Sequence, residues 1–231
     1  MIPLRDTIRS RRFPVVTVTI ITLNVIVFLY ELSLGSATLL HRFASQYGMI
    51  PAVQLHMIQE APFSLSTWSP MVTSMFIHGG LMHIIGNMLY LWVFGDNVED
   101  VLGKARFVAF YLLAGIAGNI GHLLANPAST VPTIGASGAV AGVLGAYFIT
   151  FPRSRILALV PFLFIITFME LPAVLFLFLW FGLQLLNGLA ALAIPATTVA
   201  WWAHIGGFGA GMIMIKLLRQ HHYRKIDKTR S

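Results

Sequence analysis

The chain has 231 residues, of which 57% are hydrophobic and only 10% are charged. A soluble domain carries about a quarter charged residues, so this composition excludes an ordinary soluble protein and indicates a membrane protein with several spans. The absence of cysteine excludes disulfides, thiolate catalysis and cysteine-ligated metals. The net charge of +7 is better explained by basic loops at a membrane surface than by nucleic-acid binding.

Six apolar segments predict helices that cross a bilayer. They lie at Val15–Leu34, Leu81–Phe94, Phe107–Leu124, Ala136–Phe151, Leu171–Leu192 and Val199–Leu218. The first is longer than the apolar core of a signal peptide and is interpreted as a retained helix. The second and fourth are short, which suits helices surrounded by other helices. The predicted fold is an all-α polytopic membrane protein with six transmembrane helices.

The basic residues indicate how the chain is oriented in the membrane. All but one of its 15 Lys and Arg residues lie before the first segment, at or beyond the end of the last, or in the second and fourth connections. Only Arg42, in the long first connection, falls on the other side. The sequence therefore predicts a cytoplasmic N-terminal segment at residues 1–14, a basic cytoplasmic tail at residues 219–231, and a prokaryotic plasma membrane as the location.

Two stretches outside the six segments are also apolar. The first connection, Gly35–Gly80, contains Phe63 and Trp68 and is too apolar for a solvated linker. We expect short amphipathic helices there, lying in the outer interface. Ile156–Met169, which Pro161 interrupts, is interpreted as an interfacial or re-entrant piece that leads into the fifth helix.

Polar side chains inside membrane spans are costly and are functional candidates. The second segment contains His83 and Asn87, which lie one turn apart on one helical face, and His78 stands at its entrance. Such a pair of donors could bind an oxyanion. The alternatives are a helix–helix hydrogen bond or a metal site, but the spacing differs from His-Glu-x-x-His and no carboxylate lies nearby.

A serine surrounded by small residues opens the fourth segment. Ser137 follows Gly135 at a helix N-terminus, where its own N–H is free of the helix and could join an anion site. The motif is not Gly-x-Ser-x-Gly, because position 139 is alanine. The alternative is a packing face, since Gly138 and Gly142 form a Gly-x-x-x-Gly pair.

The third candidate is His204, close to the start of the sixth segment. A lone histidine in a helix is more often a structural hydrogen-bonding residue than a base. However, the second, fourth and sixth segments run in the same direction through the membrane. All three groups of polar residues are therefore expected at similar depth on the outer side.

Other polar residues are interpreted as structural. Three acidic residues are expected to form a cytoplasmic loop network with two basic ones: Asp96, Glu99 and Asp100 with Lys104 and Arg106. Glu170 is interpreted as a loop or capping residue at the cytoplasmic end of the fifth helix. Asn119 and His122, on the third helix, are interpreted as packing contacts.

Three motifs on alternate helices together resemble those of the rhomboid family of intramembrane serine proteases. They are His-x4-His-x3-Asn, Gly-x-Ser-Gly and Ala-His-x-x-Gly. The resemblance covers nearly the whole chain and implies a six-helix rhomboid protease domain at residues 15–218. It implies Ser137 as nucleophile and His204 as general base and then acid. It also implies an oxyanion site formed by His83, Asn87 and the Ser137 N–H, with His78 and Gly135 in supporting positions.

The sequence departs from the family pattern at two places. The Trp-Arg pair often found in the first connection is here Trp68-Ser69-Pro70. Some family members carry a tyrosine, stacked on the catalytic histidine, four residues after the serine, and that position is Ala141 here. Another side chain is therefore expected to support His204.

The resemblance implies hydrolysis of transmembrane segments of single-span membrane proteins through an acyl-enzyme. We expect a Ser–His dyad, because no intramembrane carboxylate is suited to be a third member, and a wet cavity that opens outward. No cofactor, metal or nucleic acid is expected. The expected partners are the bilayer and the substrate, and the sequence leaves the oligomeric state open.

Two other functions are considered. One is an inactive relative that binds membrane clients, and the other is a channel or transporter, which the lack of internal repeats disfavours.

Overall fold

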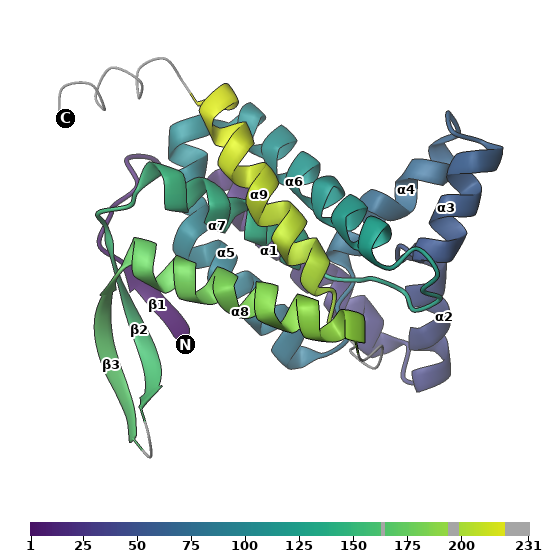
Figure 1. Cartoon of the computed structure of the whole chain (residues 1–231), viewed down its shortest axis with the longest axis horizontal. Coiled ribbons are helices and arrows are strands. Elements are labelled where there is room, and N and C mark those ends of the chain that lie inside the picture. The colour runs from purple at the N-terminus through teal and green to yellow at the C-terminus, as the bar shows by residue number, and fades with distance from the viewer. Residues whose placement is uncertain (163–164, 194–198, 220–231) are drawn as a thin grey trace.

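A computed structural model describes residues 1–162, 165–193 and 199–219 (Figure 1). Helices dominate these residues, and one small antiparallel sheet accompanies them. In chain order the elements are β1 (Ile2–Asp6), α1 (Val15–Ser33), α2 (Ala37–Tyr47), α3 (Pro51–Glu60), α4 (Leu65–Thr73), the 3-10 helix η1 (Ser74–Phe76), α5 (Leu81–Leu102), α6 (Lys104–Ala125), α7 (Ser137–Thr150), β2 (Arg155–Phe162), β3 (Ile165–Pro172), α8 (Ala173–Ala193) and α9 (Trp201–Leu218).

Length and apolarity identify three or four membrane spans among the described residues. α1, α6 and α8 qualify alone, and α5 qualifies only together with α4 and η1, from which it is bent by 89°. α7 is a shorter apolar helix of 14 residues. α9 is rich in glycine and carries His204 and Lys216, which lower its hydropathy. The chain is thus a multi-pass membrane protein. Length and hydropathy alone do not identify α7 and α9 as membrane spans.

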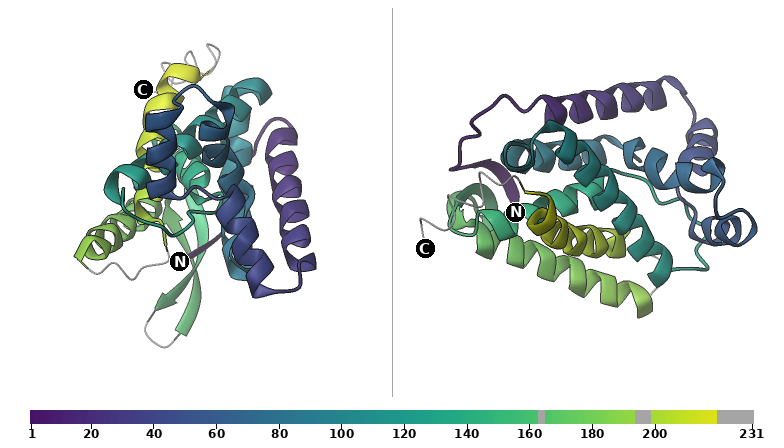
Figure 2. Two further views of the ribbon diagram at one scale, coloured as in Figure 1. Left: turned by 90° about the vertical axis from the view of Figure 1, so that its right-hand side faces the viewer. Right: turned by 90° about the horizontal axis from the view of Figure 1, so that it is seen from above.

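Helix α7 occupies the middle of the bundle and contacts α5, α6, α8 and α9. Its close contact with α9 depends on facing glycines: a β-carbon at Gly207 would overlap the Gly138 carbonyl oxygen, and one at Gly211 would overlap the Gly142 carbonyl. Small residues let membrane helices approach backbone to backbone. α1 and α8 lie on opposite sides of the bundle (Figure 2).

Helix α5 extends further than predicted, to Leu102, and ends at Gly103, whose φ of 77° suits glycine. Asp96, Glu99 and Asp100 therefore lie on the helix, and their predicted location in a loop was wrong. The carboxylate of Glu99 instead binds the start of α1, and Asp100 accepts a hydrogen bond from the Arg11 N–H at 3.2 Å. The end of α5 thus holds the segment that leads into the first span.

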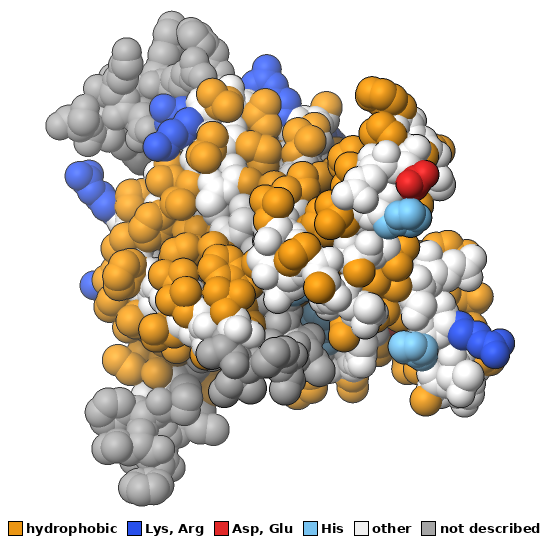
Figure 3. Space-filling model, turned by 45° about the vertical axis from the view of Figure 1, so that its right-hand side comes forward, with side chains coloured by type: hydrophobic (Ala, Val, Ile, Leu, Met, Phe, Trp, Pro, Cys, Tyr) orange, Lys and Arg blue, Asp and Glu red, His pale blue; other side chains and the backbone are white. Residues whose placement is uncertain are grey.

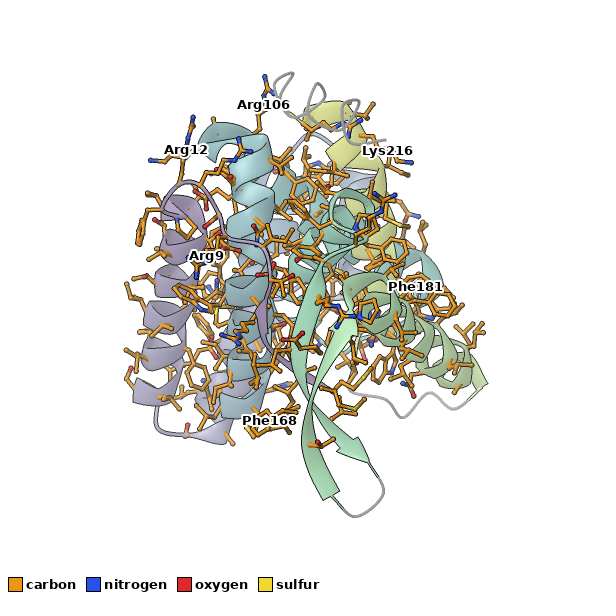
Figure 4. The ribbon with its side chains drawn as sticks, turned by 90° about the vertical axis from the view of Figure 1, so that its left-hand side faces the viewer. Arg9, Arg12, Arg106, Phe168, Phe181 and Lys216 are labelled. Carbon is orange, nitrogen blue, oxygen red and sulfur yellow. The ribbon has the colours of Figure 1, made fainter. Side chains whose placement is uncertain are left out.

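Basic side chains gather where α1 and α6 begin and α9 ends. Arg12, Arg106 and Lys216 lie at this same end of the bundle (Figure 4). The Arg106 guanidinium donates to the Leu218 carbonyl at 3.0 Å, tying α6 to the end of α9. On the face that Figure 3 shows, hydrophobic side chains are widespread away from this end. This distribution is typical of a helix bundle with one basic membrane interface.

Residues 156–162 and 165–169 lie in the two strands of a β-hairpin, so a strictly all-α description was wrong, while the interfacial or re-entrant placement of this segment stays a prediction. β2 and β3 pair antiparallel, β1 pairs with the other edge of β2, and the hairpin projects from the bundle (Figure 1). Glu170 lies in β3 and forms an ion pair with Arg155 at 3.8 Å, rather than capping a helix. The β-branched and aromatic residues of this stretch favour strands, and Pro161 is tolerated near the tip of the hairpin.

The first connection contains three short helices, α2, α3 and α4, as predicted. The Ser36 side chain caps α2 by accepting from the Leu39 N–H at 3.2 Å, a common helix start. Phe63, between α3 and α4, and Leu65, the first residue of α4, are 99% and 84% exposed. Large apolar side chains with this exposure fit the predicted contact with a membrane interface, which stays a prediction.

Candidate active site

The loop between η1 and α5 is held by a buried carboxylate from α1. The His78 N–H donates to both oxygens of Glu31, at 3.1 and 3.2 Å, and Glu31 is only 2% exposed. Both ring nitrogens of His78 are buried without a partner among the described residues. Sequence reasoning missed Glu31, although a carboxylate within the first apolar segment was a signal.

His83 is oriented by the same loop. Its Nδ1 accepts a hydrogen bond from the Gly79 N–H at 3.4 Å, so the neutral ring carries its proton on Nε2. The ring of His78 lies edge-on to that of His83, with centroids 5.0 Å apart. A β-carbon built on Gly135 would lie 2.6 Å from the His83 Nε2. The Nε2–H donor therefore faces the segment that leads into α7.

Asn87 presents a second donor to the same segment. Its Nδ2 is buried and has no hydrogen-bond partner in the described part of the chain. That nitrogen would lie 3.6 Å from a β-carbon on Gly135. A buried amide without a partner is costly unless a ligand or water satisfies it. His83 and Asn87 thus both lie next to Gly135, on one face of α5.

The segment before α7 is fixed by backbone hydrogen bonds. Thr133 pairs with Met49 in an isolated bridge, and the Gly135 N–H donates to the Ser74 carbonyl at 2.8 Å. The Asn119 Nδ2 donates to the Ser74 hydroxyl at 3.0 Å, consistent with its interpretation as a packing contact. These bonds place Ser137, which is half-buried, as the first residue of α7. Its N–H belongs to the helix N-terminus, where donors are available to a ligand.

His204 lies in the first turn of α9 and is held from α8. Its Nδ1 lies 2.8 Å from the Gln184 Oε1. The ring also lies near two indoles, with centroids 6.1 Å from Trp180 and 6.0 Å from Trp201. Ala141, four residues after Ser137, is fully buried and contributes no ring beside the imidazole. Support for the imidazole therefore comes from α8 and from within α9, and the sequence analysis did not identify Gln184.

One cavity of about 1220 Å³ brings most of the predicted residues together. Its wall includes side chains from α5 to α9, among them His83, Asn87, Ser137, Gln184 and His204. His122 also lines it, while His78 lies behind His83 and does not. No hydrogen bond joins Ser137 and His204 within residues 1–162, 165–193 and 199–219. A recessed histidine is visible in a hollow of the surface (Figure 3).

Metal binding has little support from the side chains in this region. Within the described ranges, no group of three or more His, Cys, Asp or Glu side chains is arranged to hold a metal ion. The Nδ1 of His83 accepts a hydrogen bond from the Gly79 N–H, and the Nδ1 of His204 is hydrogen-bonded to the Gln184 amide oxygen. What the cavity offers is a hydroxyl, an imidazole and two N–H donors at the end of a helix, which is a set suited to acyl transfer.

Comparison with known proteins identifies the family. A rhomboid domain matches residues 65–221. The chain belongs to the rhomboid family. The mouse presenilin-associated rhomboid-like protein, mitochondrial, is 38% identical over 112 residues, which cover 46% of this chain and 30% of that protein. The Bacillus subtilis putative rhomboid protease YdcA is 39% identical over 80 residues, covering 35% of this chain and 40% of that protein.

Rhomboid protease GluP of Bacillus subtilis is 42% identical over 79 residues, which cover 34% of this chain and 15% of GluP. In each case the similarity spans less than half of the relative. The rhomboid match runs from α4 to α9, so it includes every predicted site residue from His78 to His204. Glu31 precedes the matched range, and Gln184 lies within it.

Proposed function

We propose that this rhomboid-family member is an intramembrane serine endopeptidase in which Ser137 is the nucleophile and His204 the general base. The observation that carries the proposal is that Ser137, His204 and the donor pair of His83 and Asn87 all line one cavity among the central helices. Family membership supports the reaction class, and two of the relatives are named as rhomboid proteases.

In this mechanism the His204 Nε2 accepts the Ser137 hydroxyl proton as the Ser137 Oγ attacks the scissile carbonyl. The tetrahedral intermediate collapses when His204 gives that proton to the leaving amine, leaving an acyl-enzyme. Water then enters from the cavity, is deprotonated by His204, and releases the second product. Ser137 and His204 thus form the dyad, and the mechanism requires their side chains to come into hydrogen-bond contact when substrate binds.

The negative charge of the intermediate would be stabilised by three donors: the His83 Nε2–H, the Asn87 amide and the Ser137 N–H. The position of His83 next to Gly135 supports this role, as does the lack of any other partner for the Asn87 amide in the described structure. Such donors favour the transition state when they are already oriented before the reaction. His78 supports the ring of His83 from behind.

We further propose that residues 15–218 form a six-span domain in which α7 and α9 also cross the membrane. Their burial by other helices explains how short or less apolar helices can do so. The shared basic end supports cytoplasmic termini; residues 220–231 of the basic tail lie outside the described part of the chain. A plasma membrane remains our proposal, since the relatives include both mitochondrial and Bacillus proteins.

The substrates would be transmembrane segments of single-span proteins. A helical segment hides its carbonyls in hydrogen bonds, so cleavage requires local unwinding, which glycine or other weak helix formers near the scissile bond assist. The wild-type protein, reconstituted in liposomes with a single-span reporter, should cleave it. A solute-flux assay on the same liposomes tests the channel alternative. Flux without cleavage would overturn the proposal, as would cleavage that is unchanged in Ser137→Ala.

A further inference from the structure

Gln184 stands out among the residues that the proposed mechanism does not use. It lies on α8, where it is 7% exposed, although most of its neighbours on that helix are apolar. A buried polar side chain costs free energy unless its hydrogen bonds are satisfied, and leucine would fill the same space without that cost. Both ends of the Gln184 amide are satisfied, which points to a specific role for the group.

The hydrogen bonds of Gln184 fix the direction of its amide. The Nε2 donates to the Trp180 carbonyl at 3.1 Å. A carbonyl can only accept, so the nitrogen must face Trp180 and the Oε1 must face His204. That oxygen lies 2.8 Å from the His204 Nδ1. An amide oxygen also can only accept, so His204 must carry a proton on Nδ1.

This arrangement determines which nitrogen of His204 can act as a base. With the proton on Nδ1, the neutral imidazole keeps its lone pair on Nε2. In serine proteases with a third member, a carboxylate that accepts from the Nδ1–H performs this task, holding the tautomer and the ring orientation. Here a neutral amide makes the same contact. The ring of Trp180, from the same helix, lies beside the imidazole.

We propose that Gln184 is a positioning residue that holds His204 with Nε2 available to Ser137, as the third member of the constellation. The proposal rests on the proposed protease function and extends it. It also replaces the expectation of an unassisted dyad.

The test compares kcat and KM for cleavage of the reporter by the full-length protein in liposomes. Gln184→Leu should lower kcat about 10- to 100-fold, the loss expected when one hydrogen bond in a buried site is removed, and should leave KM within about threefold. Asn187→Leu is the matched control. Asn187 lies one turn away on α8 and donates to the Leu183 carbonyl at 2.8 Å, but it does not contact His204.

Gln184→Glu provides a readout that does not depend on the leucine variant folding. A carboxylate can still accept from the Nδ1–H, so kcat should recover above that of Gln184→Leu. A carboxylate also favours the protonated imidazole, so the acid limb of the pH–kcat profile should move to higher pH by about one unit. The other titratable side chains on the cavity wall are His83, Tyr90 and His122, from α5 and α6, and they are unchanged.

The outcomes separate the two levels of the argument. A Gln184→Leu variant within twofold of the wild-type kcat, or a Gln184→Glu profile that matches the wild type, overturns the positioning role and leaves the protease function standing. An effect on KM alone also overturns it. If the wild type shows no cleavage that depends on Ser137, the proposed function fails, and the role of Gln184 fails with it.

Discussion

Gly135 packs directly against the imidazole of His83. A β-carbon at position 135 would lie 2.6 Å from Nε2 and 2.7 Å from Cε1, closer than real β-carbons approach. The backbone at this residue also has a φ of +116°, which side-chain-bearing residues rarely adopt. Two independent constraints therefore require glycine here. The same contact brings the Nε2–H of His83 to the segment that precedes Ser137.

Gly135→Ala should consequently impair activity by displacing His83. We expect kcat to fall by about 100-fold or more, since one oxyanion donor is lost and the backbone is strained. Reporter cleavage in liposomes measures the effect. Gly209→Ala is the control, because a β-carbon there would meet no atom within 4 Å. Near-normal activity of Gly135→Ala would mean that the His83 contact has no part in the reaction.

Asn87→Ala tests the second donor. Loss of one oxyanion donor typically lowers kcat by about 10²–10³-fold, and we expect a value in this range with little change in KM. Because the Asn87 amide has no other partner in the described structure, its removal should not destabilise the fold. Asn187→Ala, an exposed asparagine on α8, should behave as wild type. Retention of nearly full activity would remove Asn87 from the proposed role.

The contact between α7 and α9 predicts a large effect on stability. In Gly207→Ala the new methyl group would overlap the Gly138 carbonyl, and overpacking costs about 1–3 kcal/mol. The better helix propensity of alanine offsets at most about 1 kcal/mol. Thermal unfolding in detergent should therefore show a lower Tm for Gly207→Ala and an unchanged or higher Tm for Gly209→Ala. Equal Tm values for the two variants would show that the helices are less closely packed than described.

The docking of the N-terminal strand should depend on pH through Asp6. Its carboxylate accepts hydrogen bonds from the Tyr147 hydroxyl and, at 2.9 Å, from the Asn97 amide. Burial nevertheless raises the pKa of Asp6 from 3.8 to about 6. The folded state thus binds the proton more tightly than the unfolded state, so stability should fall as the pH rises from about 4 to about 6 and then level off.

Hydrogen exchange of residues 2–6 between pH 4 and 8, corrected for the intrinsic rates, measures this dependence. Asp6→Asn should remove it, because an amide does not titrate in this range. A wild-type strand whose protection increases over the same pH interval would contradict the assignment of this effect to Asp6.

Much of the site could be predicted because its signals are local. The helical period places His83 and Asn87 on one face, and the common direction of three segments places Ser137 and His204 at the same depth. Those relationships depend only on spacing and on the positive-inside rule. The structure adds that Gly135 is the point where the donors meet the serine segment.

The rest depends on contacts between distant residues. Glu31 and Gln184 were visible as polar residues in apolar segments, but their partners, the His78 N–H and the His204 ring, depend on how α1 and α8 pack. The sheet was missed because β1 and β2 are separated by almost the whole helical domain. Hydropathy alone also could not distinguish an apolar hairpin strand from a short membrane segment.

The central claim is that Ser137 is a nucleophile activated by His204. Its most direct test is to treat the reconstituted protein with a fluorophosphonate, which modifies activated serines, and to map the adduct by mass spectrometry. We predict one adduct, on Ser137, with labelling lost in His204→Ala while the variant keeps its fold. An adduct on another serine, or Ser137 labelling unchanged in His204→Ala, would contradict the claim.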